Sequence, residues 1–460
     1  MRIIICGAGQ VGFGIAERLA AENHSVTVID SSPALITKIK DTLDVQGVVG
    51  HAAHPNVLAR AKAENADMII AVTLYDEVNM VACQVAHSIF QVPTKVARVR
   101  AQSYMEETYG DLFSRDHMPI DVIISPEKEV GETVLRRISL PGAVDVVRFA
   151  DDSVVFLAIE CGPDCPVVDT PLSQLTELFP DLGAVVVGSV NSEGRVNVTH
   201  STDQLQVGDI AYVVVRRGTV RRTLSIFGHD EPDARRILIA GGGNIGTYVA
   251  HELRERMSSV RLVLIENSRT RAEAIVNELD GGATVLAGNA LDQNILMEAD
   301  IAKTDLMVAL TNDDQTNILS AVMAKRLGCA VNMSLLNNAS YHDFTHTLGI
   351  DAYINPRSVT ISRILQYVRR GRIRSVYSVR DGQAEVIEAE ALETSPLVGA
   401  PLRDLDLPEG IRVGSVYRDG EAFLPDGSTH IRAGDRVVIF AAGDAIRKTE
   451  QLFRVSLEFF

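Results

Sequence analysis

The sequence has no tryptophan, and aromatic residues make up only 5% of its 460 residues. A hydrophobic interior must therefore be built mainly from aliphatic side chains, which suits buried parallel β-strands. Cationic residues are also outnumbered, because 44 Lys and Arg stand against 60 Asp and Glu and give a formal net charge of -16. Nucleic acids and anionic membranes are bound through clustered cations, so neither is expected as a direct partner.

Long apolar segments are missing as well. No apolar run approaches the ~18 residues of a membrane span, and the start of the chain lacks the apolar stretch and cleavage site of a secretory signal peptide. The five cysteines are odd in number and scattered, as expected for reduced cytosolic thiols. Cys161 and Cys165 lie close together, but no second Cys or His pair at zinc spacing is nearby, so we expect no metal site. We therefore predict a soluble cytoplasmic protein without direct membrane insertion.

The sequence does contain an internal repeat. Residues 3–12, IIICGAGQVG, return as ILIAGGGNIG 234 residues later. Residues 66–73 return at 304–311, after 238 residues, and the shorter segment 187–190 returns after 226 residues. Such small changes of spacing indicate insertions and deletions between two copies of one pair of domains.

Short aliphatic runs alternate with amphipathic segments in the larger part of each copy. The runs near 2–6, 25–30, 44–49, 67–72 and 94–99 are predicted strands of a parallel sheet with helices on both faces. The predicted fold class is therefore α/β, with two tandem Rossmann-like doubly wound parallel sheets, each followed by a small α+β module. The predicted domains are 1–140, 141–228, 235–375 and 376–460, and the polar residues 228–234 are the predicted linker between the halves.

Each copy has a Gly-x-Gly-x-x-Gly motif between an apolar strand and a helix. The first glycine permits a tight turn, the second lets a pyrophosphate approach the backbone, and the third lets the helix pack on the strand. Free N–H groups and the helix dipole at that terminus then favour a phosphate. Asp30 and Glu266 follow at the ends of the next strands, where a carboxylate holds a ribose diol and repels a 2′-phosphate. The pattern favours NAD or an adenine nucleotide over NADP.

Other candidates lie where later strands end. Thr73, Thr311 and Arg98 are expected at the carboxyl edge of their sheets, where ligands bind in such folds. Arg98 either pairs with a phosphate or is a solvated surface arginine. The spacing of the repeat makes Ser334 its counterpart in the second copy, which would then lack this cation.

Two further patterns have ordinary interpretations. His51 and His54 have no acidic or cysteine partner in their motif, so we expect a loop and helix-start role rather than metal binding. The basic run 363–374 is interpreted as a solvated helix face, with contact to an acidic partner as the alternative. Its arginines are Arg363, Arg369, Arg370, Arg372 and Arg374.

These motifs resemble the regulator-of-potassium-conductance (RCK, or KTN) family, in its form with two tandem pairs of RCK amino- and carboxyl-terminal domains. The resemblance covers nearly the whole chain and rests on both glycine loops, on residues 50–55, on residues 76–84 and on residues 311–314. Members of the family bind NAD or NADH, with ATP and ADP as further ligands. They act on the cytoplasmic face of a potassium-translocating membrane subunit.

The resemblance implies a nucleotide site in each copy and no catalytic residues. It also implies a partner of the Trk type (TrkH- or TrkG-like), a homodimer or homotetramer, and a peripheral position on the inner face of the plasma membrane. Many related domains have Gly-Asp where this chain has Gly50-His51 and Gly288-Asn289. The implied nucleotide contacts are Gly7, Ala8, Gly9, Gln10, Val11, Gly12, Asp30, His51, Thr73, Leu74 and Arg98, with Gly241, Gly242, Gly243, Asn244, Ile245, Gly246, Glu266 and Thr311 in the second copy.

Two alternatives to a nucleotide-sensing regulator remain. One is a soluble NAD-dependent oxidoreductase, which needs an acid or base facing the nicotinamide. Neither small module offers a His–carboxylate or Ser–His pair, and no nucleophile elbow or Walker phosphate loop is present. The other is a structural assembly subunit with a vestigial pocket.

Overall fold

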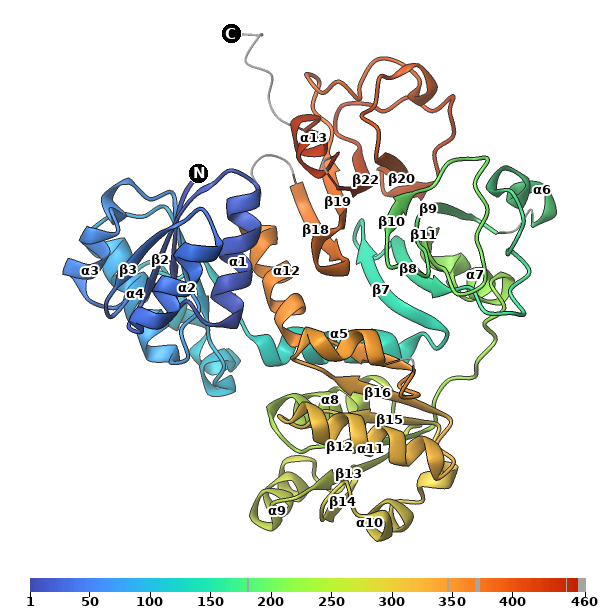
Figure 1. Cartoon of the computed structure of the whole chain (residues 1–460), viewed down its shortest axis with the longest axis horizontal. Helices are drawn as coiled ribbons and strands as arrows, with labels where there is room; N and C mark the ends of the chain where they lie inside the picture. The colour runs from blue at the N-terminus through green and yellow to red at the C-terminus, as the bar shows by residue number, and fades with distance from the viewer. Residues whose placement is uncertain (180–181, 346, 369–372, 444, 454–460) are drawn as a thin grey trace. The chain divides into compact units, whose positions relative to one another are not determined.

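Strands and helices alternate through the larger part of each half of the chain (Figure 1), and the same order of six parallel strands forms twice. The structure is a computed structural model that describes residues 1–179, 182–345, 347–368, 373–443 and 445–453. Two compact units form. The first consists of Met1–Gly131 and Asn355–Tyr367, and the second of Glu132–Ile354 and the chain from Val368 onward.

The first unit contains a six-stranded parallel sheet in the order β3-β2-β1-β4-β5-β6. Its short aliphatic strands are buried on both faces, as expected for a sheet covered by helices. We call this sheet with its helices the first lobe. Its elements are β1 (Arg2–Cys6), α1 (Gln10–Ala21), β2 (Ser25–Asp30), α2 (Pro33–Thr42), β3 (Gln46–Val49), α3 (Pro55–Arg60), β4 (Met68–Ala71), α4 (Asp76–Ser88), β5 (Thr94–Arg98) and β6 (Val122–Ile124).

The second unit repeats this sheet in the order β14-β13-β12-β15-β16-β17, again with every pair parallel. We call it with its helices the second lobe. Its elements are β12 (Arg236–Ala240), α8 (Asn244–Arg256), β13 (Arg261–Glu266), α9 (Arg269–Glu278), β14 (Thr284–Ala287), α10 (Gln293–Glu298), β15 (Leu306–Ala309), α11 (Asp314–Arg326), β16 (Val331–Leu335) and β17 (Ala352–Ile354). Each lobe is followed by a connecting helix, α5 (Pro126–Ser139) or α12 (Pro356–Val368).

The second unit also holds two five-stranded antiparallel sheets of equivalent topology, β10-β9-β11-β8-β7 and β21-β20-β22-β19-β18. The predicted fold class is confirmed. The strands are β7 (Ala143–Phe149), β8 (Val154–Glu160), β9 (Ala184–Val190), β10 (Val196–Val198), β11 (Ile210–Arg216), β18 (Ile373–Val379), β19 (Ala384–Glu390), β20 (Ile411–Arg418), β21 (Glu421–Phe423) and β22 (Arg436–Ala442). The short helices beside them are α6 (Leu175–Leu178), α7 (Val220–Ile226) and α13 (Ala445–Gln451).

The two antiparallel sheets share one core. Phe156 and Tyr212 from the first pack against Phe440 from the second, with ring centroids 6.4 and 5.6 Å from that of Phe440. A polar contact adds to this core, because the buried carboxylate of Glu388 pairs with Arg436 and accepts the backbone N–H of Ala150 at 3.2 Å. Apolar packing and a satisfied buried charge therefore hold the two small modules together.

The basic run differs from the expected helix face. Helix α12 ends at Val368 and Arg374 lies on strand β18, so the run is not one continuous helix. Arg363 pairs with Glu129 and Arg374 with Glu390, each at 3.1 Å. Arg369, Arg370 and Arg372 lie outside the described residues.

None of the helices in the described ranges has both the length and the apolar character needed to cross a membrane.

Candidate functional site

The glycine loop of the first lobe has two positions that only glycine fits. Gly7 has φ +110°, and a Cβ there would lie 3.0 Å from the carbonyl oxygen of Val72. A Cβ on Gly12 would lie 1.8 Å from the carbonyl oxygen of Gly7. In the second lobe, Gly241 has φ +109° and a Cβ on Gly246 would lie 2.0 Å from the Gly241 oxygen. The tight turn between strand and helix is therefore the same in both lobes.

The middle glycine of each loop leaves space instead. Gly9 precedes α1 in an extended conformation, with φ −66° and ψ −173°, and no side chain caps the helix. Gly243 precedes α8 with φ −70° and ψ −175°, also without a side-chain cap. A Cβ on either glycine would meet no atom within 4 Å. The first-turn N–H groups of a helix have no intrahelical acceptor and carry the positive end of its dipole, so each terminus can bind a phosphate.

The carboxylates at the ends of β2 and β13 hold these loops in place. Asp30 accepts the backbone N–H of Ala8 at 2.7 Å through one oxygen and that of Ser32 at 2.8 Å through the other. Glu266 does the same for Gly242 and Ser268, both at 2.8 Å. Two carboxylate oxygens offer about four acceptor positions, so a ribose hydroxyl still finds an acceptor there. Sequence reasoning anticipated a ribose partner but missed this anchoring contact.

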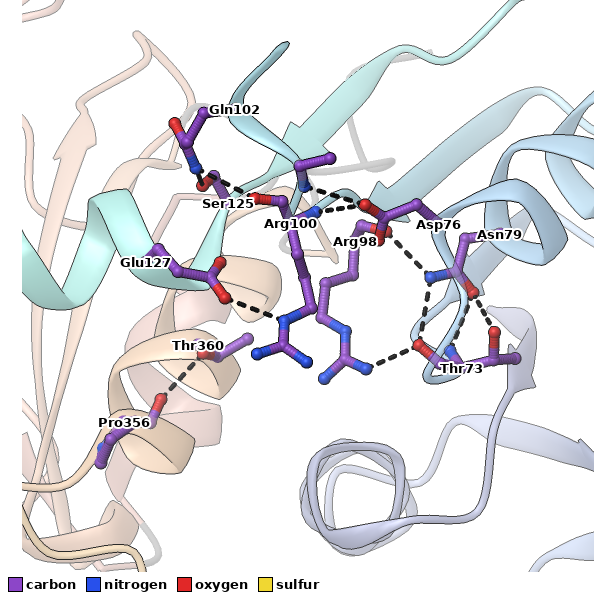
Figure 2. A network of polar contacts seen from close by, with 11 residues as sticks. Thr73, Asp76, Asn79, Arg98, Arg100, Gln102, Ser125, Glu127, Pro356 and Thr360 are labelled. Atoms are coloured by element: carbon purple, nitrogen blue, oxygen red, sulfur yellow. Dashed lines mark hydrogen bonds and ion pairs between the residues drawn. The ribbon is translucent and has the colours of Figure 1, made fainter. Parts of the chain in front are cut away.

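A buried asparagine fixes the end of strand β4. Asn79, on α4, accepts the backbone N–H of Thr73 at 2.8 Å and its hydroxyl at 2.7 Å. Its amide donates to the carbonyls of Thr73 and Arg98 at 3.2 and 2.9 Å (Figure 2). Asn317 makes the equivalent four bonds to Thr311 and Leu335 in the second lobe. The signal in the sequence was an asparagine at the same register of both copies, within an otherwise apolar helix face.

We expect Asn79→Ala to lower the free energy of unfolding of the protein by about 3 kcal/mol, because it removes a fully buried side chain and takes the partner from the part-buried Thr73 N–H and Arg98 carbonyl. Urea unfolding followed by circular dichroism measures this. Asn277→Ala is the matched control, since Asn277 is an exposed residue of helix α9, and it should change stability by less than ~0.5 kcal/mol. Equal unfolding midpoints for the two variants would contradict the assigned role.

Arg98 lies beside this network. One of its terminal nitrogens donates to the carbonyl of Thr73 at 2.6 Å, and its Nε has no hydrogen-bond partner among the described residues. Burial lowers the pKa of the Arg98 guanidinium, and the charge of Arg100 lowers it further. A guanidinium pKa remains far above neutrality, so Arg98 is a partly buried cation rather than a freely solvated one.

A second arginine lies at the same edge of the sheet. Arg100 follows strand β5, and its Nε contacts the buried carboxylate of Glu127 at 2.8 Å (Figure 2). Asp76 accepts the backbone N–H groups of Arg100 and Ala101, both at 2.9 Å, and so fixes this turn. Sequence reasoning did not single out Arg100. Its position two residues after Arg98, just beyond a strand end, was the available signal.

The strand pairing corrects one correspondence. Ser334 pairs with Ala309, as Ala97 pairs with Ala71, so Ser334 is the counterpart of Ala97. The counterpart of Arg98 is therefore Leu335, which like Arg98 also binds the buried asparagine through its carbonyl. The expected match of Arg98 with Ser334 was wrong by one residue, because the spacing between the copies changes before this strand. The second lobe still lacks the cation.

The remaining predicted residues surround these contacts. Gly50 donates its N–H to the Asp30 carbonyl at 2.9 Å, which places the exposed His51 next in the chain. The His51 and His54 rings stack with centroids 4.7 Å apart, and Leu74 is 74% exposed. Gln10, Val11, Asn244 and Ile245 form the first turns of α1 and α8.

Arg271 in the second lobe was not predicted from the sequence. It lies on α9 and donates to the Gly242 carbonyl at 3.0 Å.

No group of three His, Cys, Asp or Glu side chains is arranged as a set of ligands in the described part of the chain. Cys161 and Cys165 are both buried as free thiols.

Family comparisons agree with the repeat. Residues 3–126 and 237–356 match the family model described as the TrkA-N domain, and residues 386–454 match the TrkA-C domain. The chain is 61% identical over 460 residues to "Trk system potassium uptake protein TrkA" of Azorhizobium caulinodans. It is 39% identical over 464 residues to the protein of the same name from Halomonas elongata. Both alignments cover 100% of this chain and 100% of the relative.

Solved structures show the same fold at lower identity. The crystal structure of the GsuK RCK domain matches with a TM-score of 0.61 and 17% identity, over 98% of this chain and 94% of that chain. The GsuK channel bound to NAD matches with the same TM-score and identity, over 98% of this chain and 78% of that chain. The names of the curated relatives describe a component of potassium uptake rather than an enzyme. The chain therefore belongs to the family of Trk system potassium uptake proteins TrkA.

Proposed function

We propose that this chain is the cytoplasmic, nucleotide-sensing subunit of a potassium-uptake system, and that its nucleotide controls a membrane-embedded potassium-translocating subunit of the Trk type. The observation that carries the proposal is the pair of open helix N-termini at Gly9 and Gly243, each beside an anchored carboxylate. The family supplies the potassium-uptake context. Peripheral attachment to the inner face of the plasma membrane and assembly into a homodimer or homotetramer belong to the same proposal.

The proposed ligand is NAD(H), with ATP and ADP as competing adenine nucleotides. A structure of the same fold is described as the GsuK channel bound to NAD, which is consistent with this choice. The diphosphate would lie at the first-turn amides of α1 or α8, and the ribose at Asp30 or Glu266. Domains 1–140, 141–228, 235–375 and 376–460 would then alternate between nucleotide-binding and small modules.

Control of the partner requires two conformations of the regulator. A nucleotide shifts the balance between them only by its difference in affinity for the two, typically ~1–3 kcal/mol of coupling. Nothing in this scheme requires chemistry on the nucleotide. The test is isothermal titration of the purified full chain with NADH, NAD, ATP and ADP, followed by potassium flux in vesicles containing the membrane subunit. A chain that binds none of these ligands would refute the proposal.

We expect the first lobe to bind nucleotide more tightly than the second, because only the first has an arginine at this position. Arg98→Leu tests this explanation. The substitution gives the first lobe the residue that the second lobe has at Leu335, so the strand end should remain intact. Loss of a charge-assisted contact to phosphate is worth about 1.5–3 kcal/mol, so we expect the tighter nucleotide affinity to fall about 10- to 100-fold. Titration calorimetry measures the change.

The control for this variant removes an equal charge elsewhere. Arg195 is exposed beside strand β10, and its side chain pairs with Glu193 at the surface, so Arg195→Leu should leave nucleotide affinity unchanged. If Arg98→Leu binds nucleotide as tightly as the wild type, Arg98 has no phosphate contact.

A further inference from the structure

Helix α12 follows the second lobe in sequence but belongs to the first compact unit. Residues Asn355–Tyr367 group with Met1–Gly131. In that unit, a Cβ on Gly14 of α1 would lie 2.4 Å from the Cδ1 atom of Ile361, so Gly14 leaves the space that this side chain fills. The 3.1 Å ion pair between Arg363 and Glu129 adds a second contact. The start of α12 is therefore packed on the helix that begins at the first glycine loop.

Arg357, in the first turn of α12, has an unused guanidinium at this contact. Its Nη2 and Nε atoms lie 3.0 and 3.2 Å from the Cβ position of Gly14. Among the described residues, the guanidinium of Arg357 has no hydrogen-bond or ion-pair partner, while its backbone N–H donates to the Asn355 side chain at 2.9 Å. A guanidinium carries five donors and is always charged, so this group is available to an anion.

Comparison of the two copies shows that the first copy has no arginine at the position of Arg357. Ile124 and Ile354 pair with Arg98 and Leu335 in equivalent register, so the third residues after them, Glu127 and Arg357, correspond. Glu127 is buried and pairs with Arg100 of its own lobe. The second copy has the opposite charge at this position.

We propose that Arg357 supplies a cation to the phosphate groups of the nucleotide bound in the first lobe. Gly14 lies four residues after Gln10, about 6 Å along the helix axis and on the same face. A guanidinium against the Cβ position of Gly14 therefore lies on the face of α1 that Gln10 shares, about one turn from the start of the helix. Arginine also matches phosphate geometry with paired donors. The second repeat thus completes the binding site of the first.

This inference rests on the proposed nucleotide site and adds a form of regulation to it. A phosphate held by both α1 and Arg357 favours the conformation in which α12 packs on α1. By reciprocity, any change that moves α12 away lowers nucleotide affinity by the same factor. The binding energy of the phosphate would then be transmitted through a helix of the other repeat.

The test uses the full chain carrying Gly243→Glu, so that only the first lobe binds. Titration calorimetry measures the affinity of this Gly243→Glu chain for ADP and ATP, with and without the added substitution Arg357→Gln. Ligand-observed NMR measures the affinity of the same two proteins for adenosine, which has no phosphate. We expect Arg357→Gln to weaken ADP and ATP about tenfold and to leave adenosine unchanged. Arg357→Lys, which keeps the charge without paired donors, should recover part of the loss. Hydrogen exchange of the α12 amides should slow on adding ADP, and this slowing should disappear in Arg357→Gln.

The control is Arg195→Gln, which removes an exposed charge outside the first compact unit and should leave ADP affinity unchanged. Equal ADP affinity in the Gly243→Glu chain with and without Arg357→Gln would overturn the inference while nucleotide sensing stands. An equal loss for adenosine and ADP would also overturn it, because the effect would then come from packing rather than from a phosphate contact. If neither the wild type nor the Gly243→Glu chain binds any nucleotide, the proposed function itself is refuted.

Discussion

Replacing Gly9 with glutamate is expected to abolish nucleotide binding in the first lobe, with a loss of affinity of at least about 100-fold. The new carboxylate would occupy the space in front of the first turn of α1, where no atom lies within 4 Å of a Cβ. A negative charge at a helix N-terminus is itself favourable, so the helix should remain formed. The same charge competes for the amides and repels a diphosphate. Binding should therefore be lost without loss of folding.

Two matched variants separate these effects. Gly9 has an extended backbone that any residue adopts, so Gly9→Ala should unfold at the wild-type temperature and lose less affinity than Gly9→Glu. Gly243→Glu should leave the tighter, first-lobe binding intact. Titration calorimetry and thermal unfolding measure both properties. A Gly9→Glu variant that keeps wild-type affinity would show that the nucleotide does not approach this loop.

The glycine loops and the doubly wound sheets could be predicted because their signals are local. Gly7 needs its positive φ and Gly12 needs the absence of a Cβ, and both requirements appear directly in the residue type. The aliphatic strands also have a clear pattern, so β1 and β2 match the predicted 2–6 and 25–30. The exact residue-by-residue correspondence between the two copies could not be predicted from such local signals. The error at Ser334 arose because insertions between the copies change the spacing from strand to strand.

Contacts between distant segments were less accessible to prediction. The buried amide of Asn79 was visible as a shared register, but its four bonds depend on how α4 packs on strands β4 and β5. The position of Arg357 depends on α12 folding with a unit that lies more than two hundred residues earlier in the sequence. No local pattern encodes such a pairing. For the same reason, Arg363 was interpreted as a solvated residue although it has a partner in Glu129.

The second large effect concerns stability, and it should follow from Phe440→Ala. The Phe440 side chain is fully buried, and it packs between the two antiparallel sheets against Phe156 and Tyr212. Truncating a buried phenylalanine to alanine costs about 3–5 kcal/mol, because the apolar contacts are lost and a cavity remains. A Cβ on Gly188 would lie 2.5 Å from the Phe440 ring, so this backbone packs directly on the ring and has no side chain to fill the cavity.

A double-mutant cycle tests whether this energy belongs to the contact between the sheets. Phe156→Ala and Phe440→Ala remove two rings of one cluster, so their effects on the free energy of unfolding should differ from additivity by about 0.5–1.5 kcal/mol. Phe227 is equally buried but lies in the separate core of the first small module, so Phe227→Ala and Phe440→Ala should be additive. Urea unfolding of the three single variants and the two double variants supplies the numbers. Additive effects for Phe156 and Phe440 would mean that each ring stabilises only its own sheet, and that the shared core does not join the two repeats.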